Sequence, residues 1–307
     1  MKRSIVLYTE GLNFSGDTLE KKALGGSETA FIQLARELAR AGHTVDAFCP
    51  CPRPGVFHDV TYHDLSAFED WRSHASCDLF ICSRFFHVFF KPIRARTRIL
   101  WNHDAFDLWQ FELLARCIHE IDHVYCLSEH HLDHFARHLP HHRDKLSKTH
   151  NGLDFETIHA ATEGVEKKHQ ILFTSRPERG LLNALDLYEA LDDRTLAFRH
   201  GTYDYPWKNG GVDQAEAACE KRMQALRDQG FPVVSEAWSK PELYAEMAAG
   251  KVVLHPTETP EVFCLSAAEA QACQTIYLAP DHSAFKEVVA YPGLDPTNRT
   301  LAFRHGT

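Results

Sequence analysis

Residues 260–270 of the chain read PEVFCLSAAEA, and residues 275–279 read TIYLA. The first stretch contains many small apolar residues and predicts a short buried helix, and the second predicts a buried strand. Helices that alternate with buried strands are typical of α/β folds. Two glutamates, Glu261 and Glu269, stand at the opening of this helix and within it. A carboxylate on a buried helix needs a polar partner, so both glutamates are candidate site residues.

The spacing of the two glutamates suits a ligand pocket. An eight-residue step on a helix returns to within about 80° of the same face, two turns further along. We expect Glu261 in the loop before the helix and Glu269 in its third turn, so both carboxylates could line one pocket. The free N–H groups of the first turn would form an anion site between them. A nucleotide sugar has this pattern, with a diphosphate between two hydroxyl-bearing sugars. Glutamates eight residues apart also occur on solvated helix faces without any function.

The same alternation of strands and helices extends over the rest of the chain and predicts parallel sheets covered by helices. The first series has strands at 4–8, 44–48, 78–82, 98–101 and 123–127, a helix at 28–41, and a helix from the N-cap Ser128 through His138. A second series has strands at 170–174, 196–198, 233–234 and 252–255, with helices at 181–191, 212–229 and 241–248. The polar residues 151–168 are expected to connect the two series. We therefore predict two Rossmann-like, doubly wound domains, residues 1–155 and 156–307, that face a central cleft.

Composition narrows the class of protein. Of the 307 residues, 44% are hydrophobic and 24% are charged, as in globular proteins, and the net charge is −9. A nucleic-acid partner is therefore not expected. The sequence has no apolar run of about 18 residues, and its basic start is followed by too short an apolar run for a signal peptide. Nine scattered cysteines without a Cys-x-x-Cys pair are best explained as reduced thiols. These features predict a cytoplasmic protein.

Two glycine- or arginine-containing motifs follow predicted strands. Gly25-Gly26-Ser27-Glu28 opens the first helix, where glycines let the backbone approach a ligand closely; a tight turn capped by Ser27 explains these letters equally well. The run Ser175-Arg176-Pro177-Glu178-Arg179-Gly180 has the same place in the second series. Arginines beside a helix N-terminus oppose its dipole unless an anion is present, and a diphosphate would supply that anion. A surface salt bridge with Glu178 is the alternative.

Histidines form two further patterns. Trp101-Asn102-His103-Asp104 lies at the end of a predicted strand, where His103 could hydrogen-bond a sugar hydroxyl, although a lone histidine is more often structural. His119-Glu120-Ile121-Asp122-His123 matches the His-Glu-x-x-His pattern of zinc proteases. It runs directly into a predicted strand rather than lying within a helix, and no third ligand follows it, so we do not assign a metal site.

Taken together, these positions resemble glycosyltransferase family 4, retaining enzymes of the GT-B fold. The resemblance rests on six motifs in the family's order over nearly the whole chain: Gly25-Gly26-Ser27-Glu28, His103-Asp104, Asn151-Gly152-Leu153-Asp154, residues 175–180, His255-Pro256 and Glu261-x7-Glu269. It implies transfer of a sugar from a UDP- or GDP-sugar to a hydroxyl acceptor, with retention of anomeric configuration. It also implies that no metal or other cofactor is needed, which agrees with the lack of an Asp-x-Asp motif.

The resemblance also implies roles for individual residues. Glu261 would contact the donor sugar and Glu269 the ribose hydroxyls, and His103 would lie beside the transferred sugar. Backbone N–H groups at the start of the predicted helix would assist two arginines in holding the diphosphate, and two glycines of the first domain would approach the phosphate and sugar. These diphosphate and donor-binding residues are Arg176, Arg179, Phe263, Cys264, Leu265, Gly25 and Gly26.

The chain departs from the family pattern at several points. Arg179 stands only three residues after Arg176, where the family usually has a lysine somewhat further on, and Cys264 and Gln274 stand where glycine is common. The nine residues 194–202 recur letter for letter as residues 299–307, where family members continue with further helices. We therefore expect a C-terminal domain that is truncated, or completed by a partner or oligomer, and a second copy of the repeated segment without an evolved packing role.

Several alternatives remain open at this stage. One is a non-catalytic GT-B-like protein that binds a nucleotide or a partner. Another is a nucleotide-sugar epimerase or a phosphorylase-like enzyme on the same architecture. The acceptor could be a saccharide, a lipid-linked molecule or another hydroxyl compound. Phe85, Phe86, Phe89, Phe90 and Lys91 could form a surface for peripheral membrane contact, and core packing is the alternative use of these residues.

Overall fold

The computed structural model describes residues 1–203, 205, 210–289 and 301–303, and its strands and helices alternate as predicted. The chain forms two compact units. Unit 1 contains Met1–Thr18 and Gly25–Gly152, and unit 2 contains Leu19–Leu24 and the chain from Leu153 onward. The boundary lies slightly before the predicted one at residues 155 and 156. Leu19–Leu24 belongs to unit 2, where the amide of Lys240 donates to the carbonyl oxygen of Leu19 at 2.9 Å.

Unit 1 is built on an eight-stranded sheet of order β3-β4-β2-β1-β5-β6-β7-β8. All neighbouring strands are parallel except β3 and β4, which pair in antiparallel fashion. The strands are β1 Ser4–Tyr8, β2 Thr44–Cys49, β3 Gly55–Phe57, β4 Val60–Asp64, β5 Cys77–Ser83, β6 Ala95–Trp101, β7 His123–Cys126 and β8 Leu146–Lys148. Because side chains on both faces of a parallel sheet are covered by helices, its central strands are apolar, as in β1.

The helices of unit 1 bury their apolar faces in the core. They are α1 Gly26–Arg40, α2 Phe68–His74, α3 Leu108–Cys117 and α4 Glu129–His138, and the last begins at the predicted N-cap Ser128. Helix α1 buries Phe31 and Ile32 completely or nearly so. Phe86 and Phe89 are buried in the core, whereas Phe90 is 49% exposed. The sequence left open whether these phenylalanines pack in the core or form a surface, and the first two pack in the core.

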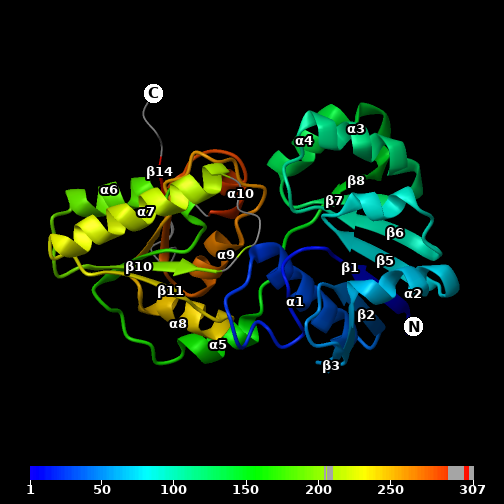
Figure 1. Ribbon diagram of the computed structural model, residues 1–307, viewed down its shortest axis with the longest axis horizontal. Helices are drawn as coiled ribbons and strands as arrows, with labels where there is room; N and C mark the ends of the chain where they lie inside the picture. Colours follow the sequence, from blue (N-terminus) through cyan, green and yellow to red (C-terminus); the bar gives the residue numbers. More distant parts are fainter. Residues whose placement is uncertain (204, 206–209, 290–300, 304–307) are drawn as a thin grey trace. The chain divides into compact units, whose positions relative to one another are not determined.

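Unit 2 is built on a parallel sheet of order β11-β10-β9-β12-β13-β14. Figure 1 labels the neighbouring strands β10 and β11 of this sheet. The strands are β9 Gln170–Phe173, β10 Ala197–Thr202, β11 Val233–Ala237, β12 Val252–Leu254, β13 Ile276–Pro280 and β14 Leu301–Phe303. The helices are α5 Phe155–Thr162, α6 Leu181–Ala190, α7 Gly210–Asp228, α8 Lys240–Ala249, α9 Leu265–Ala272 and α10 Phe285–Val288. The predicted α/β architecture of two Rossmann-like sheets is confirmed.

Helix α5 lies within the polar stretch that the sequence predicted as a simple connection. Asp154 caps this helix, since its side chain accepts a hydrogen bond from the amide of Thr157 at 3.0 Å. Only Ile158 is buried, and it packs with Tyr244 and Met247 of α8. A helix with one buried apolar residue and an exposed Phe155 shows no clear hydrophobic periodicity, so pattern alone did not reveal it.

The repeated nine-residue segment takes part in the sheet of unit 2 in both copies. The first copy contains β10, and Leu301–Phe303 of the second copy forms β14. Strand β14 pairs in parallel with β13, with Leu301 opposite Leu278 and Phe303 opposite Pro280. The rest of the second copy and the expected truncation fall outside the described residues. Within the described part of the chain, none of the helices has the length and apolarity needed to span a membrane.

Candidate functional site

The carboxyl ends of β9 and β12 bring the predicted diphosphate loop and the first glutamate together. These strands are parallel neighbours, so the loops that follow them leave the same edge of the sheet. The Arg179 guanidinium forms an ion pair with the Glu261 carboxylate, and their side chains are 30% and 10% exposed. The nearby carboxylate outweighs burial and raises the pKa of Arg179. Two residues that the sequence assigned to one ligand are therefore in direct contact.

The backbone of Glu261 is fixed by the loop that follows β13. Its amide donates to the Ser283 hydroxyl at 3.0 Å, and its carbonyl oxygen accepts from the amide of Ala284 at 3.1 Å. Because the backbone is held on one side and the carboxylate on the other, Glu261 has one well-defined position in unit 2.

A buried polar cluster lies behind the glutamate loop. Nδ1 of His255 is 2.6 Å from the hydroxyl of Tyr277, which is 3.2 Å from Sγ of Cys264. Burial and the nearby charge of Arg179 lower the pKa of His255 to about 3, so this imidazole is neutral. Burial and the charge of Glu261 raise the pKa of Cys264 to about 12, so its thiol stays protonated.

The predicted anion-binding segment immediately precedes and opens α9. Phe263, Cys264 and Leu265 are all buried, and Leu265 is the first helical residue. The N-terminus of a helix favours a nearby anion. In α9 the amide of Ala267 donates to the carbonyl oxygen of Cys264 at 3.1 Å. Cys264 is the N-cap and has a left-handed backbone with φ +67°. Glycine adopts this conformation without steric cost, which explains why the common glycine at this position suits the loop.

Gly180 is required by the close packing of the arginine loop. Its φ is +101°, and a Cβ at this position would lie 2.6 Å from the carbonyl oxygen of Pro256. Helix α6 begins at the next residue, and its Asn183 amide donates to the same carbonyl oxygen at 3.1 Å. The arginine loop and the His255-Pro256 loop are thereby held against each other.

Arg176, the other predicted diphosphate residue, forms an ion pair with Glu178 at 2.9 Å. Its guanidinium also lies over the ring of Tyr205, 5.3 Å from the centroid. A salt bridge with Glu178, the alternative to diphosphate binding predicted from the sequence, is therefore present. Each predicted diphosphate arginine has a carboxylate partner within unit 2.

Glu269 lies in the second turn of α9, one turn earlier than predicted, because the helix begins at Leu265. Its carboxylate accepts from Nζ of Lys240 at 2.6 Å and from the Tyr244 hydroxyl at 3.2 Å, and both partners are on α8. The side chains of Lys240 and Glu269 are only 8% and 2% exposed. The predicted contact of Glu269 with a ribose would therefore share this carboxylate with a buried ammonium group.

In unit 1, the predicted glycines begin the first long helix. Gly25 is the N-cap of α1, and its carbonyl oxygen accepts from the amide and hydroxyl of Thr29 at 2.9 and 2.8 Å. Gly26 is the first helical residue. The Ser27 hydroxyl donates to the Glu28 carboxylate at 3.0 Å and makes no side-chain cap, so the alternative of a serine-capped turn does not apply.

His103 lies in the loop after β6, next to Trp101, whose ring centroid is 4.3 Å from that of the imidazole. Its Nε2 is buried and has no hydrogen-bond partner among the described residues. Burial, together with the nearby Arg84 and His131, lowers the pKa of His103 to about 3, so the imidazole is neutral. A neutral imidazole nitrogen can donate to or accept from a hydroxyl group.

The His-Glu-x-x-His pattern does not form a metal site. His119 lies in a single 3₁₀ turn and His123 begins β7, so the pattern spans no helix. Across the described residues, no group of three or more histidine, cysteine or acidic side chains is arranged to hold a metal ion.

Solved structures share this fold over nearly the whole chain. Sucrose-phosphate synthase from Thermosynechococcus elongatus is 14% identical, with a TM-score of 0.73 over 98% of this chain and 86% of that chain. Anabaena Alr3699/HepE in complex with UDP-glucose is 14% identical, with a TM-score of 0.70 over 99% and 86%. An α,α-trehalose-phosphate synthase (UDP-forming) from Burkholderia vietnamiensis is 12% identical, with a TM-score of 0.67 over 94% and 87%.

The chain has the fold of these glycosyltransferases. The expected GT-B fold is thereby confirmed. No family model matches the sequence, and none of the curated proteins matches it either. At identities of 12–14%, these structural matches establish the fold alone.

Three partners of the predicted site residues were not found by sequence reasoning. Lys240 and Tyr244 pair with Glu269, and Arg84 pairs with Glu28 and Asp104. Arg84 directly follows β5, so a charged residue at the carboxyl end of a predicted strand was the available signal. Lys240 and Tyr244 gave no such signal, because they lie far from Glu269 in sequence.

Proposed function

We propose that this protein is a retaining glycosyltransferase that moves a sugar from a UDP- or GDP-sugar to a hydroxyl acceptor. The observation that carries the proposal is the ion pair between Arg179 and Glu261 beside the start of α9. We assign the carboxylate to the donor sugar and the guanidinium to the diphosphate, and their contact at the carboxyl edge of a parallel sheet supports binding of one ligand by both. Two structures of the same fold, both of Anabaena Alr3699/HepE, contain UDP with glucose and UDP-glucose, which supports a nucleotide-sugar donor.

In this proposal, unit 2 binds the donor. Glu261 accepts hydrogen bonds from the hydroxyls of the sugar, and Glu269 contacts the ribose. Arg176, Arg179 and the backbone N–H groups of Phe263, Cys264 and Leu265 stabilise the negative charge that develops on the departing diphosphate. Since Arg176 and Arg179 each have a carboxylate partner, the diphosphate must join or replace those partners when it binds.

In unit 1, Gly25, Gly26 and His103 are proposed to contact the phosphate and the transferred sugar. The buried Nε2 of His103 would bind a sugar hydroxyl. The acceptor hydroxyl attacks from the face that the nucleotide leaves, so the product keeps the anomeric configuration of the donor. We propose that the protein belongs to glycosyltransferase family 4 and acts in the cytoplasm without a metal ion. The acceptor could be a saccharide, a lipid-linked molecule or another hydroxyl compound.

One observation favours a non-catalytic relative of these enzymes as the second candidate. The predicted donor-binding charges of unit 2 are all paired, Arg176 with Glu178, Arg179 with Glu261 and Glu269 with Lys240. A protein that only binds a nucleotide or a partner could keep these pairs permanently. Measured turnover of a nucleotide sugar distinguishes the two candidates.

The test substitutes Glu261 by Ala and measures release of UDP or GDP from a panel of nucleotide sugars, together with nucleotide affinity by titration calorimetry. The proposal predicts that Glu261→Ala abolishes turnover and leaves nucleotide affinity largely intact, because Arg179 remains to bind phosphate. Glu258→Ala, at an exposed position in the same loop, is the control and should keep full turnover. Wild-type-like turnover in Glu261→Ala would contradict the role of this glutamate.

A further inference from the structure

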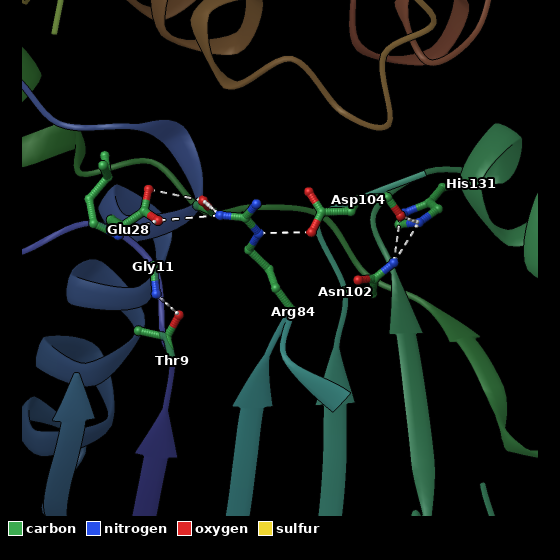
Figure 2. A network of polar contacts seen from close by, with 9 residues as sticks. Thr9, Gly11, Glu28, Arg84, Asn102, Asp104 and His131 are labelled. Carbon is green, nitrogen blue, oxygen red and sulfur yellow. Dashed lines mark hydrogen bonds and ion pairs between the residues drawn. The ribbon is translucent and has the colours of Figure 1, made fainter. Parts of the chain in front are cut away.

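Arg84 is the first residue after β5 and has an unusual backbone, with φ +73°. Such a conformation is unfavourable for a residue with a side chain, so the surrounding contacts must hold it there. Its side chain is 22% exposed and lies between two carboxylates of unit 1 (Figure 2). Nε is 2.8 Å from the carboxylate of Asp104, and Nη1 is 3.4 Å from that of Glu28.

Glu28 is the buried one of the two carboxylates that contact Arg84. Its side chain is 2% exposed, and its Oε1 also accepts from the amide of Leu12 at 3.3 Å. A Cβ on Gly11 would lie 2.2 Å from the same oxygen, so a side chain there would displace this carboxylate. Arg84 also donates to the Ser27 hydroxyl at 3.2 Å. The guanidinium therefore reaches the first turn of α1, directly after Gly25 and Gly26.

Asp104 is the second carboxylate that contacts Arg84, and it directly follows His103 in sequence. The carbonyl oxygen of Asp104 accepts from the Asn102 side chain at 2.6 Å and from Nε2 of His131 at 3.0 Å. Nδ1 of His131 accepts from the amide of Leu127 at 3.1 Å, so the ring is neutral and Nε2 carries the proton. The loop that carries His103 is thus held at its backbone by two buried side chains and at Asp104 by Arg84.

We propose that Arg84 is a positioning residue for sugar transfer, whose guanidinium fixes the Gly25-Gly26 end of α1 relative to the His103 loop. This inference rests on the proposed function, since it assigns those two segments to substrate binding. A direct role in binding an anionic substrate fits less well. Two carboxylates surround the one guanidinium, so the local charge is negative and does not attract phosphate.

The role of Arg84 has an electrostatic consequence for His103. The charged and titratable groups that face this imidazole are Arg84 and His131, and Asp104 is its chain neighbour. Removing the Arg84 charge should raise the pKa of His103, while burial still keeps it below the ordinary value. This change can be observed by NMR of the histidine ring whether or not the protein turns over a substrate.

The experiment compares Arg84→Met, Arg84→Lys and the double variant Arg84→Met/Glu28→Gln with the wild type. Arg96→Met, at an exposed position of unit 1, is the matched control. The readouts are kcat and KM for the nucleotide sugar, UDP affinity, and titration of the His103 ring. Since misplacement of a reacting group by about 1 Å costs up to about 100-fold, we expect Arg84→Met to lower kcat by about 10- to 100-fold. UDP affinity should fall much less than kcat, because most of the proposed donor-binding residues are in unit 2 and only Gly25 and Gly26 are in unit 1.

The double variant separates positioning from simple charge neutralisation. Glu28→Gln removes the buried charge that Arg84 balances, so the double variant should fold even where Arg84→Met does not. If Arg84 positions the two segments, the double variant keeps the kcat defect, and Arg84→Lys, which cannot bridge two carboxylates in a fork, restores kcat only in part. Full kcat in the double variant would show that Arg84 only neutralises Glu28, and would overturn the inference.

Failure of the proposed function leaves a distinct result. If the wild type cleaves no nucleotide sugar, the proposed function fails, and amide hydrogen exchange in the Gly25-Gly26 and His103 segments decides whether Arg84 holds them. Faster exchange in both segments of the double variant would support positioning. Exchange rates identical to those of the wild type would overturn it.

Discussion

The buried pair of Lys240 and Glu269 provides a quantitative prediction for unit 2. The Lys240→Met substitution removes the ammonium group and leaves the Glu269 carboxylate, 2% exposed, with Tyr244 as its remaining partner in the structure. Breaking a buried ion pair from one side costs about 3–5 kcal/mol. Because the Tyr244 hydroxyl still donates to the carboxylate, we expect the lower end, a loss of about 3 kcal/mol in the free energy of unfolding.

The assay is guanidinium chloride unfolding followed by tryptophan fluorescence, to which the buried Trp238 contributes for unit 2 and the buried Trp101 for unit 1. With an m-value of roughly 3 kcal/mol/M, the loss of stability lowers the midpoint of the unit 2 transition by about 1 M. Lys168→Met, at an exposed position, is the matched control and should leave the midpoint unchanged. The double variant Lys240→Met/Glu269→Gln removes both charges and should recover most of the loss.

A loss below about 1 kcal/mol in Lys240→Met would refute the reasoning, since an exposed ion pair contributes no more than that. The same variants test the proposed ribose contact. If Glu269 binds the ribose, Glu269→Gln weakens UDP binding even when stability is restored in the double variant. An unchanged dissociation constant would restrict Glu269 to its structural pairing with α8.

Two further predictions concern backbone strain and buried histidine. Gln274 has φ +56° and completes a Schellman motif after α9, in which its amide donates to the carbonyl oxygen of Gln271 and the amide of Thr275 donates to that of Ala270. Gln274→Gly should therefore raise the free energy of unfolding by about 1 kcal/mol. A lower denaturation midpoint would contradict this. Burial lowers the pKa of His131 from its ordinary 6.5 to about 4. The imidazole of His131 therefore binds a proton more tightly in the unfolded chain than in the folded one. As a result, the free energy of unfolding falls by about 2 kcal/mol between pH 7 and pH 5. His131→Gln should remove this part of the slope, and an unchanged slope would show that other groups cause it.

Most of the fold could be predicted from hydrophobic patterns. Strand β1 has the predicted bounds, and α4 has both its predicted N-cap and its predicted end. These elements bury continuous apolar runs or regular apolar stripes, which are visible in a single sequence. The elements that were missed, such as β3, β8 and α5, are short or bury few residues, so they depend on tertiary contacts that pattern alone does not reveal.

The candidate site could be predicted in part. The family resemblance assigned Arg179 and Glu261 to one nucleotide sugar, and the structure brings these two residues into contact. Cys264 and Gln274 also stand where glycine is common in the family pattern, and both have positive φ. The pairing of Glu269 with Lys240 and of Arg84 with Glu28 and Asp104 could not be predicted, because these contacts join residues far apart in sequence.

The central claim is that the protein transfers a sugar from a nucleotide sugar with retention. The most direct measurement is NMR of the purified protein with a panel of UDP- and GDP-sugars, following release of the nucleoside diphosphate and the anomeric signal of the first-formed sugar product. We predict that at least one donor is cleaved and that the product keeps the anomeric configuration of that donor. Binding of UDP or GDP without cleavage of any donor, or an inverted product, would contradict the claim.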